Sequence, residues 1–159
     1  YESLIKGTKE TLRLSINPNL SVAKIRLIAY SENDYPAIGL KVDNAGKSIL
    51  TCTYKESKLV YEFESDSLNK ITETFNYTNE DLEKYAEVLT TYKAKQEALD
   101  AIDGITATLV ESGVNFSYNA VTDLSIATIA SLKDFNYFEK NTTSKVVNFE
   151  MEAMRYTCE

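Results

Sequence analysis

From residue 48 to residue 77, apolar and polar residues alternate, which is the pattern of strands that bury one face. Three such runs follow one another, separated by the short polar segments 55–58 and 65–67. The residues of the apolar parity are Leu50, Cys52 and Tyr54, then Leu59, Tyr61 and Phe63, then Ile71, Phe75 and Tyr77. Alternating strands joined by short turns predict an antiparallel meander.

After the meander the hydrophobic period changes from two residues to about 3.6. Residues 78–81 offer a helix cap, acidic residues occupy the first turn, and Gly104 suits a helix exit. We therefore predict a helix over residues 80–102. Its buried stripe is expected to consist of Leu82, Tyr85, Ala86, Leu89, Tyr92, Gln96 and Leu99.

A second hairpin is predicted beyond this helix, because alternation resumes on both sides of the turn 111–113. Residues 124–132 fit a helix or a strand. Residues 145–155 predict a C-terminal helix, capped by Thr143 or Ser144, with Val147, Met151 and Met154 on one stripe and Phe149 beside it. The expected fold class is α+β: an antiparallel sheet, made of meander plus hairpin, packed against one long helix and the C-terminal helix.

Residues 1–46 form a separate section of the pattern. Strands are predicted over 11–16, over 21–30 and at Ile38, Leu40 and Val42. So short a segment makes a poor independent core. We expect a β-rich N-terminal extension packed on the main α+β domain, residues 47–159.

The two cysteines bear on both fold and compartment. Cys52 lies in a predicted strand and Cys158 is next to the last residue, where a core position is unusual. This placement favours one disulfide, clamping the tail to the sheet in an oxidising, extracytoplasmic compartment; the alternative is two free thiols. The chain begins at Tyr1 rather than methionine, so we expect a signal or anchor upstream, for a protein secreted or held at the cell surface.

Charge and composition exclude several functions. The net charge is −7 and no basic cluster interrupts it, which disfavours binding to nucleic acids and to anionic membranes. We therefore expect attachment to a membrane only through an anchor. The chain has no histidine, so Ser-His-Asp and Cys-His nucleophile systems and His-ligated zinc are absent. Nucleotide-binding and hydrolase motifs are also missing, and we expect no cofactor.

Short motifs in the chain resemble a known family. Leu50–Thr53 reads LTCT at the start of the meander, Gly104–Thr106 opens the second hairpin, and Arg155–Cys158 ends the C-terminal helix. In this order the motifs resemble the YehR-like lipoproteins, small secreted or lipid-anchored proteins of low-GC Gram-positive bacteria, over residues 48–159. Arg155 stands where that family usually has glycine. The resemblance implies an extracytoplasmic α+β domain of unassigned function, with no catalytic residues to carry over.

Three functions follow from these observations. The first is a non-enzymatic binding or scaffold module at the cell envelope, contacting a protein, peptide or envelope component through an open sheet edge or through exposed aromatics, for which the loop pair Tyr137 and Phe138 is the candidate. The second is a small hydrolase, if Glu62, Glu64 and Glu73 face one another across adjacent strands. The third is a secreted glycoprotein that uses the sequons at Asn76, Asn115 or Asn141.

Overall fold

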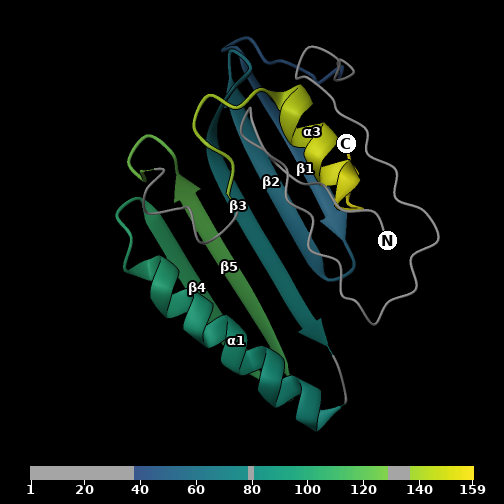
Figure 1. The fold of residues 1–159 in the computed structure, drawn as a ribbon, viewed down its shortest axis with the longest axis vertical. Helices are drawn as coiled ribbons and strands as arrows, with labels where there is room; N and C mark the ends of the chain where they lie inside the picture. Colours follow the sequence, from purple (N-terminus) through teal and green to yellow (C-terminus); the bar gives the residue numbers. More distant parts are fainter. Residues whose placement is uncertain (1–37, 79–80, 129–136) are drawn as a thin grey trace, which may run out of the picture.

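The computed structural model describes residues 38–78, 81–128 and 137–159. Its centre is a six-stranded antiparallel sheet in the order β4-β5-β3-β2-β1-β6 (Figure 1). The α+β fold expected from the pattern is therefore confirmed. The elements are β1 (Lys47–Tyr54), β2 (Ser57–Glu64), β3 (Ser67–Thr78), α1 (Leu82–Asp100), β4 (Ile105–Ser112), β5 (Asn115–Asp123), α3 (Ser144–Ala153) and β6 (Thr157–Cys158).

The meander β1–β2–β3 is held by two tight turns. Ser65 and Asp66, between β2 and β3, both have positive φ, 51° and 59°, as a type I′ hairpin turn requires. Next to this turn the register shifts, because Glu62 pairs with Lys70 while Phe63 pairs with Leu68. The shift leaves one extra residue in β3, a β-bulge. It allows both Leu68 and Ile71 to reach the buried face.

One face of the sheet carries the core, and both helices cover it. On this covered face α1 packs over β4 and β5, and α3 packs beside β1 (Figure 1). The rings of Phe75 and Tyr92 stack 4.4 Å apart between β3 and α1. The Tyr61 hydroxyl donates to the Met151 sulfur of α3 over 3.1 Å. The opposite, outer face is not covered by any described helix.

The long helix is confirmed, but its buried stripe differs from the prediction. Asp81 is the N-cap and accepts from the backbone N–H groups of Glu83 and Lys84. The half-buried and buried positions of α1 are Tyr85, Val88, Leu89, Tyr92, Lys95, Gln96 and Leu99. Leu82 and Ala86 are exposed. Ala86 lies about 100° around the helix from Tyr85, outside the face that the tyrosine rings turn toward the sheet.

The C-terminal helix is confirmed with two differences. Thr143 is the N-cap but makes no side-chain cap bond. Instead the backbone N–H and the hydroxyl of Ser144 both donate to Asp66, at 3.0 and 2.5 Å. Met154, expected on the buried stripe, is 48% exposed, because the helix ends at Ala153 and the chain reverses through Arg155.

The disulfide between Cys52 and Cys158 is present, as expected, and it joins β1 to β6. Thr51 donates to and accepts from the backbone of Glu159, so Cys52 and Cys158 form the adjacent non-hydrogen-bonded pair. Their Cα atoms are 4.1 Å apart, since facing side chains are closest at such pairs. The tail is thereby clamped to the sheet.

The N-terminal section is described only from residue 38. The predicted strand at Ile38, Leu40 and Val42 is wrong, because this segment has no regular secondary structure and Val42 points to solvent. Ile38 and Leu40 nevertheless pack against the core. The two earlier predicted strands lie outside the described residues. Residues 124–126 form a turn and residues 127–128 have no regular secondary structure, while the remainder of 124–132 lies outside the described part. Among the described helices, none has the length and apolar content to span a bilayer.

Candidate functional site

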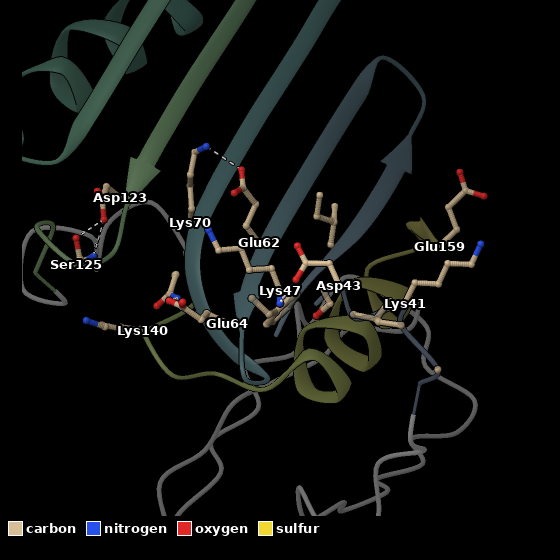
Figure 2. Close-up of a pocket in the computed structure, with 16 residues that line it drawn as sticks. Lys41, Asp43, Lys47, Glu62, Glu64, Lys70, Asp123, Ser125, Lys140 and Glu159 are labelled. Carbon is tan, nitrogen blue, oxygen red and sulfur yellow. Dashed lines mark hydrogen bonds and ion pairs between the residues drawn. The ribbon is translucent and has the colours of Figure 1, made fainter. Parts of the chain in front are cut away.

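An open groove of about 890 Å³ crosses one end of the outer face (Figure 2). Its floor follows a cross-strand row in which Ile49 of β1, Glu62 of β2, Lys70 of β3 and Asp123 of β5 are register partners. Residues 39–41 before β1 and Lys140 before α3 add to its wall. The groove is thus assembled from segments far apart in the sequence.

The acidic groups of the groove are mostly held by neighbours. Glu62 pairs with Lys70 at 2.8 Å. Asp123 accepts from both the hydroxyl and the backbone N–H of Ser125, and these hydrogen bonds lower the pKa of its carboxyl group. Glu64 accepts from the amide of Asn69 over 3.2 Å. The floor therefore presents carboxylates in fixed positions.

The basic groups around the groove are less constrained. Among the described residues, nothing forms a hydrogen bond or ion pair with the ammonium groups of Lys41, Lys47 and Lys140, which line the rim (Figure 2). Ile49 is more than half exposed and adds an apolar surface to the groove. Free ammonium groups beside fixed carboxylates suit a ligand with charges of both signs.

A second polar centre lies on the covered face, where Glu73 of β3 points into the layer beneath the helices. Both of its oxygens contact the Lys95 ammonium of α1, at 2.6 and 2.7 Å. The Tyr137 hydroxyl donates to the same carboxylate over 2.9 Å. The side chain of Glu73 is only 13% exposed and that of Lys95 27%. This contact joins β3, α1 and the segment before α3.

Tyrosines surround Glu73. Burial, and then the negative charge of Glu73, raise the pKa of the hydroxyl groups of Tyr92, Tyr118 and Tyr137. Burial is also the main cause of the raised pKa values of Tyr61 and Tyr156, to which Glu73 contributes. These phenols therefore stay neutral and serve as packing groups, and Tyr61 and Tyr137 also donate hydrogen bonds.

The three candidate carboxylates are not brought together. Glu62 lies on the outer face with Lys70, whereas Glu73 shares the covered face with its neighbours Ile71 and Phe75. Glu64 ends β2 beside Asn69. The sheet itself separates Glu62 from Glu73, so the arrangement offers no acid/base pair made of these groups. No cluster of metal-ligating side chains occurs in the described parts of the chain.

The aromatic pair expected at the surface is largely interior. Phe138 is 7% exposed and meets the Tyr61 ring edge-on at 5.7 Å, so the expectation that it is exposed is wrong. Tyr137 is half-buried and bonded to Glu73. The pair packs over β2 and β3, where it fills the covered face between the two helices. A role of either residue in partner binding stays a prediction.

Both edges of the sheet are partly closed. On β4 the N–H of Ala107 donates to Asp100 at 3.2 Å, and its carbonyl accepts from Gln96 at 3.4 Å. At the other edge, β6 pairs with β1, and Thr51 exchanges two backbone hydrogen bonds with Glu159. Along an edge strand, only every second residue turns its backbone N–H and C=O groups away from the sheet. Beyond Ala107, the residues of β4 whose backbone groups remain available for pairing are Leu109 and Glu111. A long added strand does not fit either edge.

Comparison with known proteins bears on the fold. No protein-family model matches the chain, and no curated protein sequence matches it. The structure is similar to the NMR structure of the E. coli YehR protein, with a TM-score of 0.55 and 12% identity over 76% of this chain and 93% of that one. A protein from Streptococcus pneumoniae TIGR4, also solved by NMR, aligns with a TM-score of 0.47 and 15% identity over 90% of this chain and 100% of that one. The similarity to YehR shows a YehR-like fold.

Two features of these sites escaped the sequence analysis. Glu73 has the parity of Ile71 and Phe75, so a charge at a core position of β3 was visible in the pattern. Lys95 likewise falls on the helical face between Tyr92 and Leu99. An acid and a base at core positions of neighbouring elements are a signal for a buried ion pair. The sequence carries no such signal for the groove, because its residues come together only through the order of the strands in the sheet.

Proposed function

We propose that the protein is a non-enzymatic binding module of the cell envelope that works outside the cytoplasm, and that its ligand is an extended peptide lying in the outer-face groove. The observation that carries the proposal is the open groove itself, in which ammonium groups without a partner among the described residues stand beside fixed carboxylates. The partly closed edges favour this groove over strand addition.

The groove has dimensions that suit a peptide. From β5 to β1 it crosses three strand intervals. At about 4.8 Å per interval this is roughly 14 Å, the length of about four residues of extended chain. Charge along the row changes sign between Glu62, Lys70 and Asp123, so a peptide of alternating sign can match it.

The compartment is part of the proposal. The Cys52–Cys158 disulfide supports an oxidising environment, because thiols of cytosolic proteins are usually kept reduced. The net charge of −7 likewise favours a polypeptide ligand over nucleic acid. Secretion or anchoring at the cell surface is the arrangement that we propose for the whole protein.

The proposal is tested with a synthetic hexapeptide of alternating lysine and glutamate, blocked at both ends, added to the ¹⁵N-labelled full chain. We expect saturable amide shifts at Ile49, Glu62, Lys70 and Asp123, and binding that weakens as salt rises. Lys47→Glu should weaken binding about fivefold, which corresponds to a single rim contact of about 1 kcal/mol.

The matched control is Lys55→Glu, which makes the same charge change in the β1–β2 turn, at the far end of the sheet from the groove. It should leave the affinity unchanged. Equal weakening by both variants would mean that only net charge matters. Shifts confined to Leu109 and Glu111 would instead assign the peptide to the β4 edge, and either result overturns the groove as the binding site.

A further inference from the structure

The Lys95 ammonium occupies a site built like a receptor for an amine. One carboxylate, Glu73, holds it through two short contacts of 2.6 and 2.7 Å. Two aromatic rings face it, with centroids 5.8 Å away for Tyr92 and 5.4 Å away for Tyr118. A carboxylate combined with ring faces is the arrangement that recognises organic cations. We name Glu73, Tyr92, Tyr118 and Tyr137 the Glu73 cage.

The Glu73 cage is pre-organised by groups other than Lys95. Tyr137 fixes the carboxylate through its 2.9 Å hydrogen bond. Ala120, the register partner of Glu73 on β5, is too small to fill the space above the sheet. The neighbouring Tyr118 is fully buried, and its hydroxyl finds no hydrogen-bond partner among the described residues. An unpaired buried hydroxyl leaves the site with unused hydrogen-bonding capacity.

Lys95 itself contributes only its ammonium group to these contacts. It reaches the site from α1 on a flexible four-carbon stem and is 27% exposed, so the stem can swing to solvent without unwinding the helix. We propose that the Glu73 cage is a binding site for primary alkylammonium ligands, and that Lys95 is its tethered occupant, which a ligand ammonium displaces. This site lies on the face opposite the groove and does not depend on the proposed function.

The geometry requires a ligand whose ammonium group carries N–H donors and sits on a slender chain. The two contacts to Glu73 have hydrogen-bond length, so the bound nitrogen must carry N–H donors, which a quaternary ammonium lacks. The stem of the ligand must follow the path of the lysine stem beside α1. Displacement also removes the ion pair between α1 and β3, and Leu99 is the only fully buried residue of this helix. Ligand binding is therefore coupled to how firmly α1 holds the sheet.

The test uses the full chain with Lys95→Ala, which empties the Glu73 cage, and n-propylammonium chloride as the probe. We expect a saturable rise in melting temperature and shifts of the Tyr92 and Tyr118 ring resonances. Tetramethylammonium chloride, of equal charge but without donors, should bind at least fivefold more weakly, and potassium chloride controls for ionic strength. Adding Glu73→Gln to Lys95→Ala should weaken propylammonium binding at least tenfold.

Lys95→Met is the matched control, because its unbranched side chain fills the lysine path without charge and should block the probe. Wild type should show the same ring shifts at higher propylammonium concentration, since the tethered lysine competes at an effective concentration of about millimolar or more. This wild-type titration decides the matter if Lys95→Ala does not fold. Equal responses to all three salts, or ring shifts that survive Glu73→Gln, overturn the proposal.

Discussion

Arg155 holds a left-handed backbone conformation, with φ of 72°, immediately after α3. Its N–H donates to the Glu152 carbonyl, and the N–H of Tyr156 reaches back to the Met151 carbonyl, both near 3 Å. This pair of bonds is the Schellman motif, which glycine serves best because it has no Cβ to clash. Glycine, which the sequence resemblance leads us to expect at this position, would adopt this conformation without such a clash.

Arg155→Gly is therefore expected to stabilise the protein by about 1 kcal/mol, the cost that a left-handed conformation imposes on a residue with a side chain. Urea denaturation of the full chain measures this as a rise in the unfolding midpoint. Met154→Gly is the control, because Met154 has φ of −86° and gains nothing from glycine. A midpoint that falls with Arg155→Gly would show that the arginine side chain matters more than the backbone strain.

Among the elements, β6 depends most on a covalent bond. It has two residues, and it pairs with β1 through a register that includes the disulfide. So short a strand cannot hold an edge by hydrogen bonds alone. The bond also closes the chain over a separation of 106 residues, which restricts the unfolded state strongly.

We expect Cys158→Ser to lower the free energy of unfolding by about 4 kcal/mol in the chain-entropy model. Urea denaturation without reductant measures the loss. With reductant present, wild type and Cys158→Ser should unfold at the same concentration, which separates the bond from the side chain. Hydrogen exchange at the amide of Thr51, bonded to Glu159, should quicken in the variant. Unchanged exchange there would mean that β6 stays paired without the bond.

At the scale of the whole molecule, the covered face is a layer of tyrosines around the carboxylate of Glu73. Rings from α1, β3 and β5 contact one another, as between Phe75, Tyr92 and Phe116. Neutral phenols are required throughout, because ionisation would place charge in a buried layer beside Glu73. The free energy of unfolding should therefore fall when the pH becomes alkaline enough to ionise tyrosine.

Above about pH 10 the protein should lose stability. The folded state raises the pKa values of Tyr61, Tyr92, Tyr118 and Tyr137 above the ordinary 10.0, so these groups keep their protons when the unfolded chain releases them. Their stabilising contribution is complete below the ordinary pKa and declines as the pH rises past it. Urea midpoints at about pH 8 and about pH 11 measure the loss. Tyrosine absorbance that titrates fully near pH 10 while circular dichroism stays native would contradict this prediction.

Local pattern was sufficient for most elements. Among the described residues, alternation placed the five long strands, and the 3.6-residue period bounded by residues 78–81 and Gly104 placed α1. The helix itself ends at Asp100, with Ala101 as C-cap, and Gly104 belongs to the turn before β4. Side-chain parity and helix capping depend on neighbours within a few residues, so a single sequence contains the information needed to predict them. The disulfide was predictable for a related reason, because an almost terminal cysteine has few alternatives to a bond.

Tertiary structure alone decided where these elements meet. That β5 pairs with β3, and so aligns Asp123 with Lys70, follows from burying the sheet as a whole rather than from any local pattern. The same holds for Phe138. Its local sequence predicts an exposed loop aromatic, but in the folded protein it is buried on the covered face. Long-range contacts are chosen by the total surface that they bury, and no short window of sequence contains that sum.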